Sequence, residues 1–207
     1  MARATSYSLS VFINCPFSAD YKPIFQAILF AVYACEFRPR SALEVDDGSE
    51  HRLVKIQNMI RQSRFGIHDI SNVSLDPTTK LPRFNMPFEL GLFLAAKAFG
   101  STRQRNKKAL IFDSIGYRYR DSLSDISGLD IKTHGDDVEK AIYEVRNWLD
   151  NCRGGDTSFP GGAHIVKQYR SFTKDLPSAS KKMKLKADEL TFADVCRAME
   201  RWFKDNT

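Results

Sequence analysis

The amino-acid sequence predicts an α/β fold, in which a five-stranded parallel sheet has helices on both faces and a C-terminal helical appendage follows. Over the first 150 residues, short runs of β-branched and aromatic residues alternate with segments whose apolar residues recur at helical spacing. Parallel neighbours need crossover connections, so this alternation favours a parallel sheet covered on both faces. The composition, 43% hydrophobic and 27% charged, is typical of a globular protein.

The strands are expected at residues 8–14, 38–44, 65–71 and 107–113, with a short fifth strand near Ile131. The helices are expected between them, the first at residues 20–37, where apolar residues line one face. A second helix should follow Ser49, which is available as an N-cap, and two more are expected at residues 85–100 and 136–152.

The last quarter of the chain has a different pattern. Residues 153–162 are rich in Gly and Pro and indicate a linker. Two helical stretches follow, at about residues 163–176 and 191–204, separated by the polar segment SASKKMKLK. We therefore expect an α/β domain at residues 1–152, a linker at 153–162 and a helical appendage at 163–207.

Charge and composition narrow the functional classes. The formal net charge is +6, but no basic patch interleaved with aromatic residues indicates nucleic acid as a partner. The longest apolar run is well short of the roughly 20 residues that span a membrane, and no secretory signal is apparent, so we expect a cytoplasmic protein. The cysteines are far apart and form no metal-binding pair; we expect free thiols, no metal and no cofactor.

Ligands of open parallel sheets bind beyond the carboxyl ends of the strands. The residues that follow each predicted strand are therefore the candidates. They are Asn14, Cys15, Pro16 and Phe17, then residues 44–48, then Asp69, Ile70 and Ser71, and finally Asp113.

Glu89 is the ionisable group of special interest, because it lies near the start of an otherwise apolar helix that begins at the same edge. Pro87 fits a first turn, which makes Asn85 or Met86 the expected cap and puts Glu89 in the first turn or just past it. Enclosing an ionised carboxylate in apolar groups is costly, so such a residue is expected to have a charged or hydrogen-bonding partner or a functional role. The alternative is that Glu89 is a first-turn acid that only stabilises its helix.

Two further acidic features lie at the same edge. Asp69 ends the third predicted strand, where it either contacts a ligand or caps its own loop through an Asx turn. The loop with Glu44, Asp46 and Asp47 either binds a cation or ribose hydroxyls, or is simply the turn before a helix.

Three motifs together resemble nucleoside deoxyribosyltransferases and the related TIR domains. They are VFINCPF at residues 11–17, MIRQSRFGIHDIS at 59–71 and NMPFELGLFLAAKAFG at 85–100. The resemblance covers about residues 8–150. It implies a flavodoxin-like sheet in which a Glu acts on the N-glycosidic bond of a nucleotide, a nucleoside or NAD. The TIR-like features also suggest bacterial antiphage defence, and related folds often act as homo-oligomers.

Carried onto this sequence, the resemblance implies that Glu89 and Asp69 are catalytic. A carboxylate is suited to capture the oxocarbenium-like centre that forms when a glycosidic bond breaks. The substrate-binding residues that we expect are Cys15, Pro16, Phe17, Asp46, Asp47, Arg52, Ser71, Asn85 and Phe88. Arg52 and Arg83 would assist in holding phosphates.

Two other functions remain open at this stage. One alternative is a nucleotide-binding sensor that has the pocket but no catalytic activity and signals through its C-terminal helices. The other is a TIR-like scaffold that oligomerises and binds no small molecule. The enzyme predicts released base, the sensor predicts binding without product, and the scaffold predicts neither.

Overall fold

The computed structural model describes residues 6–45, 47–72, 75, 78–153 and 159–206. It contains a five-stranded parallel sheet with the strand order β2-β1-β3-β4-β5. The strands are β1 (Ser10–Asn14), β2 (Arg38–Ser41), β3 (Phe65–Asp69), β4 (Lys108–Asp113) and β5 (Ile131–Thr133). This topology confirms the predicted fold class.

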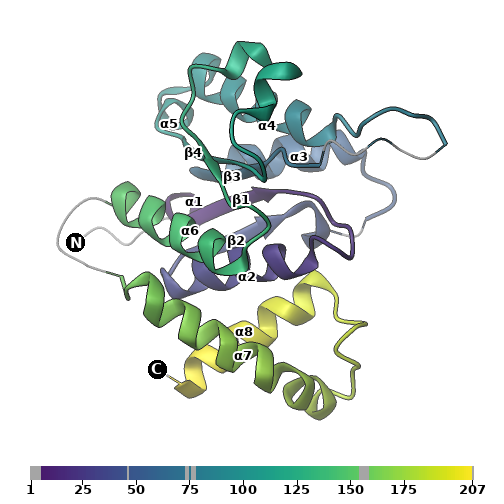
Figure 1. The fold of residues 1–207 in the computed structure, drawn as a ribbon, viewed down its shortest axis with the longest axis vertical. Coiled ribbons are helices and arrows are strands. Elements are labelled where there is room, and N and C mark those ends of the chain that lie inside the picture. The colour runs from purple at the N-terminus through teal and green to yellow at the C-terminus, as the bar shows by residue number, and fades with distance from the viewer. Residues whose placement is uncertain (1–5, 46, 73–74, 76–77, 154–158, 207) are drawn as a thin grey trace.

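Helices cover both faces of the sheet, as Figure 1 shows. One face is covered by α2 (Lys22–Ala34) and α6 (Val138–Arg153), and the other by α3 (Arg52–Gln62) and α4 (Asn85–Phe99). The alternation of β1 explains this arrangement: Val11 and Ile13 join the core beneath α2 and α6, whereas Phe12 joins the core beneath α3 and α4. Short helices complete the layers: α1 (Ser6–Leu9), η1 (Ala42–Glu44), α5 (Thr102–Arg105), η2 (Arg118–Asp121) and η3 (Ser124–Ile126).

The two C-terminal helices form an additional layer over α2. They are α7 (Gly162–Lys182) and α8 (Phe192–Asn206), and they lie at the bottom of Figure 1. The ring of Phe30 in α2 lies 5.4 Å from that of Phe172 and 4.7 Å from that of Phe203, centroid to centroid. The appendage therefore shares one core with the α/β domain. Of the expected linker, residues 154–158 lie outside the described residues, and α6 already includes Arg153.

The first C-terminal helix is longer than the sequence predicts. Instead of ending near Leu176, α7 continues through Pro177 to Lys182. A proline removes one backbone hydrogen bond, but the buried Leu176 and Ser180 hold this part of the helix on the core. The Ser180 hydroxyl also donates to the Leu176 carbonyl at 2.7 Å.

The second C-terminal helix begins where the sequence predicts. Thr191 and Asp194 form a reciprocal cap before α8: the Thr191 N–H donates to Asp194 Oδ2 at 3.1 Å, and the Asp194 N–H donates to Thr191 Oγ1 at 3.2 Å.

Two local predictions near β2 are wrong. The strand ends at Ser41 rather than at Glu44, because the Ser41 hydroxyl accepts from the Leu43 N–H at 3.3 Å and starts η1. Ser49 does not cap α3, whose N-cap residue is His51. The Ser49 hydroxyl instead donates to Asp47 Oδ1 at 2.7 Å.

Within the described part of the chain, no helix is long and apolar enough to cross a membrane.

Candidate active site

A pocket of about 260 Å³ lies at the carboxyl edge of the sheet, beyond the ends of β1 and β3. The connection after β1 leads to α2 on one face, and the connection after β3 leads to α4 on the other, so this is a topological switch point. The lining residues are Asn14, Cys15, Pro16, Phe17, Ser18, Arg52, Asn72, Arg83, Asn85, Met86 and Glu89. The pocket brings together six of the predicted catalytic and substrate-binding residues: Cys15, Pro16, Phe17, Arg52, Asn85 and Glu89. The strand-end candidate Asn14 and the predicted phosphate-holding Arg83 line it as well.

The start of α4 differs by one or two residues from the prediction. The N-cap is Phe84, neither Asn85 nor Met86, and Pro87 is the third helical residue. The first N–H groups of a helix have no partner within it, so Pro87 costs no hydrogen bond at that position. Glu89 consequently lies just past the first turn, and α4 has no acid in that turn. Glu89 is therefore not the first-turn acid of the alternative interpretation.

Asn14 ties the end of β1 to the start of α4. Its Nδ2 donates to the Met86 carbonyl at 2.9 Å and lies 3.1 Å from His68 Nδ1. These contacts engage both amide hydrogens, so Oδ1 is the acceptor that Asn14 can offer to a ligand. His68 is fully buried, and burial together with the nearby Lys107 charge lowers its pKa to about 3. His68 is thus a neutral packing residue.

Glu89 is an acid with an unusual pKa. The residue is only 5% exposed, and burial raises its pKa to about 7. Arg52 opposes this shift, with its Nη2 4.0 Å from Glu89 Oε1. At neutral pH the side chain therefore occurs in both the protonated and the ionised form. Such a group can donate a proton, accept one or act as a nucleophile.

Asp69 does not line the pocket, although the sequence predicts it as the second catalytic acid. It is fully buried, and its Oδ2 accepts from the Tyr21 hydroxyl at 2.5 Å and from His134 Nε2 at 2.9 Å. The Asp136 N–H donates to His134 Nδ1 at 2.9 Å, which leaves Nε2 as the protonated nitrogen. The Ser71 N–H donates to Asp69 Oδ1 at 2.8 Å, so both carboxylate oxygens have partners.

Cys15 lies in the wall between the pocket and this buried network. It is 2% exposed, and its pKa is raised well above its ordinary value by burial and then by the charges of Asp69 and Glu89. The thiol is therefore neutral at physiological pH, which makes it a poor nucleophile. Its role in the pocket is to form the wall.

The remaining predicted residues lie elsewhere. Phe88 is 56% exposed and does not line the pocket, and Ser71 contributes its backbone N–H to Asp69. Asp47 accepts from both the N–H and the hydroxyl of Ser49, and these hydrogen bonds lower its pKa. Asp47 and Ser49 thus have the geometry of a turn before a helix. Asp46 lies outside the described residues.

Sequence reasoning missed several residues at this edge, among them Ser18 and Met86, which line the pocket. Asn72 lines the pocket, and Tyr21 and His134 hold Asp69. His134 directly follows β5, so the rule that singled out the residues after the other strands would have found it. Tyr21 precedes α2, and the sequence has no signal that its hydroxyl reaches Asp69.

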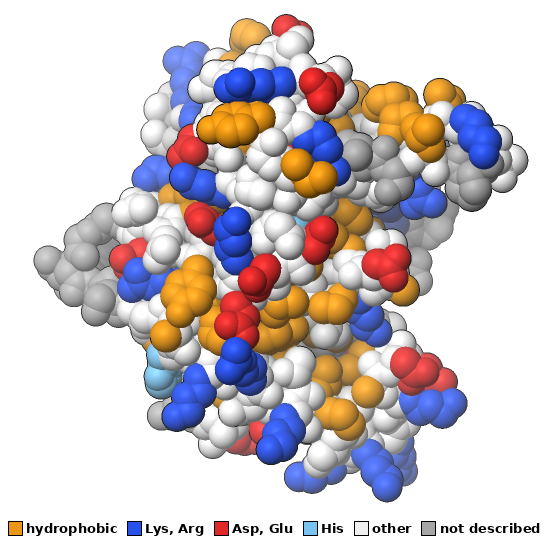
Figure 2. All heavy atoms as spheres, in the orientation of Figure 1, with side chains coloured by type: hydrophobic (Ala, Val, Ile, Leu, Met, Phe, Trp, Pro, Cys, Tyr) orange, Lys and Arg blue, Asp and Glu red, His pale blue; other side chains and the backbone are white. Residues whose placement is uncertain are grey.

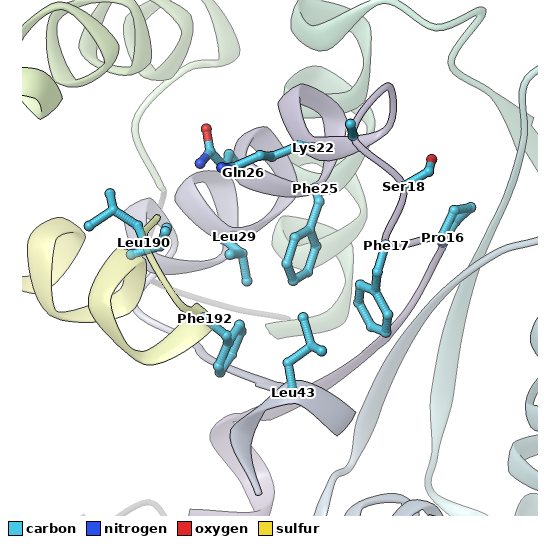
Figure 3. A pocket seen from close by; sticks show the side chains of 12 residues that line it. Pro16, Phe17, Ser18, Lys22, Phe25, Gln26, Leu29, Leu43, Leu190 and Phe192 are labelled. Carbon is cyan, nitrogen blue, oxygen red and sulfur yellow. The ribbon is translucent and has the colours of Figure 1, made fainter. Parts of the chain in front are cut away.

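An apolar pocket of about 200 Å³ adjoins the first one. Pro16, Phe17 and Ser18 line both. Figure 3 shows Phe17, Phe25, Leu43 and Phe192 pointing toward one another across it. Because Phe192 belongs to α8, the C-terminal appendage borders this apolar pocket.

Another pocket of about 200 Å³ shares Asn72 and Arg83 with the first. Asp113 lines it and is held by an ion pair with Arg118. Arg118 also donates to the Ser71 carbonyl at 2.8 Å. The three pockets are thus linked through shared lining residues at this edge of the sheet.

The four cysteines are free thiols. Among the residues that the structure describes, no three His, Cys, Asp or Glu side chains converge to hold a metal ion. The chain matches no protein-family model, and a search of curated proteins finds no match.

Proposed function

We propose that this protein cleaves or transfers at the N-glycosidic bond of a nucleotide, a nucleoside or NAD, with Glu89 as the catalytic carboxylate. The observation that carries the proposal is the position of Glu89. It lies in the wall of a pocket at the switch point of the sheet, nearly buried, with a pKa raised to about 7. Perturbed acids in such clefts are typical of catalytic sites.

The chemistry suits an ionised carboxylate. When an N-glycosidic bond breaks, positive charge develops at the anomeric carbon of the sugar. Ionised Glu89 would stabilise that charge or form an ester with the anomeric carbon. Water then attacks the same carbon, the sugar leaves with a new hydroxyl, and the water's second proton passes to solvent.

The other lining residues suit the parts of a nucleotide. Arg52 and Arg83 offer guanidinium groups for phosphates. The side-chain amides of Asn72 and Asn85 can bond ribose hydroxyls. Phe17 and the neighbouring apolar residues offer a surface for a flat ring.

The enclosure of Asp69 bears on which bond is cleaved. Glu89 is the only carboxylate among the described residues that line the pocket. An ordinary nucleobase leaves as an anion and needs a proton from a second acid. The nicotinamide of NAD is bound as a cation and leaves as a neutral molecule, so it needs none. One carboxylate therefore supports NAD, or another pyridinium glycoside, over ordinary nucleosides.

The same enclosure also favours the second candidate, a nucleotide-binding sensor. A pocket with arginines and amides but no second acid can hold a nucleotide without cleaving it. Such a sensor would signal through the C-terminal helices, which border the adjoining apolar pocket at Phe192. A role in bacterial antiphage defence rests on the TIR-like resemblance alone, in either case.

The test is to incubate the purified protein with NAD, with nucleoside monophosphates and triphosphates, and with deoxynucleosides, and to identify products by chromatography and mass spectrometry. Released base supports the enzyme, and release from NAD alone supports the argument from leaving groups. Thermal stabilisation by one ligand without any product supports the sensor. If no ligand yields a product and none stabilises the protein, both candidate functions are contradicted.

A further inference from the structure

Helix α4 has an exposed face that is entirely uncharged. Glu89 and the pocket lie on one side of this helix, and its solvent side shows a separate pattern. We define the α4 stripe by its residues: Phe84, which caps the helix, and Phe88, Gly91, Ala95, Ala98 and Phe99. At about 100° per residue these six positions fall within an arc of about 100°. They therefore lie on one side of the helix.

The stripe is open to solvent in the single chain. Phe84 is 61% exposed, Phe88 is 56% exposed and Phe99 is 87% exposed. A Cβ added at Gly91 would have nothing within 4 Å. A surface helix of a globular protein normally has charged or polar residues on this side, and a helix that is apolar all round is normally buried. The stripe therefore has the composition of a covered surface.

The exposed area suits an interface. The three phenylalanines together expose about twice the surface of one such side chain, on the order of 300–500 Å² at roughly 150–250 Å² each. Two copies that cover each other's stripe would bury on the order of 600–1,000 Å² from these rings alone. Stable protein interfaces bury about 1,200–2,000 Å² in total. The alanines of the stripe and the exposed Leu75 and Leu81 would add to the area that the rings bury.

The order of large and small residues makes the stripe complementary to itself. If two α4 helices pack antiparallel about a centre between Gly91 and Leu92, Phe84 lies opposite Phe99 and Phe88 lies opposite Ala95. The bulky ends then meet, and the small residues in the middle let the helices approach closely. Because the stripe has no charge, two identical copies do not repel each other there.

We propose that the α4 stripe pairs two copies of this chain in an antiparallel, two-fold dimer. Two exposed leucines near the start of α4 extend the contact: Leu81, three residues before Phe84, and Leu75, which pairs with Pro82. Figure 2 shows hydrophobic side chains gathered at the upper right of this face of the molecule. The dimer would hold the helix that carries Glu89, but the proposal does not depend on catalysis.

The first test is sedimentation velocity of the wild type beside Phe88→Glu and Phe99→Glu, with Ile115→Glu as the matched control. Ile115 is 57% exposed and lies outside the stripe. Circular dichroism verifies that each variant is folded. A wild-type dimer, two monomeric stripe variants and a dimeric control support the proposal. A monomeric wild type at all concentrations, or stripe variants that remain dimers, would overturn it.

The second test is a cysteine crosslink that reports the geometry. Gly91 lies beside the proposed two-fold axis, where two facing Cα atoms come within the roughly 4.4–6.8 Å that a disulfide spans. Gly91→Cys should form a disulfide-linked dimer under mild oxidation, whereas Lys97→Cys, on the other side of α4, should not. A crosslink at Lys97 but not at Gly91 would refute the antiparallel pairing.

Discussion

Arg52 Nη2 lies 4.0 Å from Glu89 Oε1, at the boundary between the solvent and a nearly buried acid. Burial and this cation act on Glu89 in opposite directions, and burial prevails, so the pKa is raised to about 7. The ionised form that the proposed chemistry needs is therefore the form that the fold disfavours. The free-energy cost of ionising Glu89 in the folded protein should be measurable as a loss of stability with rising pH and as a pH dependence of the rate.

Glu89→Gln should stabilise the protein at alkaline pH. The pKa of Glu89 rises from 4.5 to about 7 on folding, so between these values the folded state binds more protons than the unfolded state. Stability therefore falls as the pH rises through this window. At 1.36 kcal/mol per pKa unit the loss is about 3 kcal/mol by pH 8, and the glutamine variant avoids it. Urea denaturation at pH 5 and pH 8 measures the difference. An advantage of the variant that does not grow with pH would contradict the raised pKa.

Arg52→Met should shift the pH–rate profile of base release to higher pH. Without the Arg52 cation, the pKa of Glu89 rises further above its ordinary value, so a higher pH is needed to ionise it. The control is Lys55→Met, one turn further along α3, because Lys55 donates to the Val45 carbonyl and not to Glu89. Rates from pH 5.5 to 9 give the midpoints. Equal midpoints in both variants would mean that Arg52 does not act on the catalytic acid.

Tyr21→Phe should lower the free energy of unfolding while leaving KM nearly unchanged. The variant removes a 2.5 Å hydrogen bond to buried Asp69, and such bonds to charged groups contribute about 1.5–3 kcal/mol. We expect a loss of that size in the free energy of unfolding, with little change in KM. Tyr33→Phe is the control; its hydroxyl donates to the exposed Glu200 and should cost less. A large increase in KM at full stability would show that Asp69 contacts the substrate.

Gly66→Ala should destabilise the layer beneath the pocket. A Cβ at residue 66 would lie 2.6 Å from His68 Nε2 and 2.8 Å from Phe93 Cε2, both of them buried. Overpacking of this kind costs about 1–3 kcal/mol. Gly128→Ala is the control, because its Cβ would have nothing within 4 Å. Thermal melting compares the two, and equal melting temperatures would contradict the packing described here.

The fold could be predicted because its signals are local. Runs such as those around Ile13 and Ile67 alternate with helical patterns, and a parallel sheet follows from the crossover rule. The extent of α7 could not be predicted in this way. Pro177 normally ends a helix, and only the packing of Leu176 and Ser180 on the core keeps it continuous.

The site could be predicted in part for the same reason. The rule that ligands bind after parallel strands identified Cys15 to Phe17, and the helix from the same edge identified Glu89. The enclosure of Asp69 was not predictable. It depends on Tyr21 and His134, which are 48 and 65 residues away along the chain and meet the carboxylate only in the folded protein.

The most direct test of Glu89 as the catalytic carboxylate is the rate of base release from NAD by the wild type, Glu89→Gln and Glu36→Gln, at equal concentrations of folded protein. Glu36 is a matched control because it pairs with Arg153 at the other edge of the sheet. If Glu89 is the catalytic carboxylate, the wild type and Glu36→Gln release base, and Glu89→Gln releases none above background. Equal release by Glu89→Gln would contradict the assignment of Glu89 as the catalytic carboxylate.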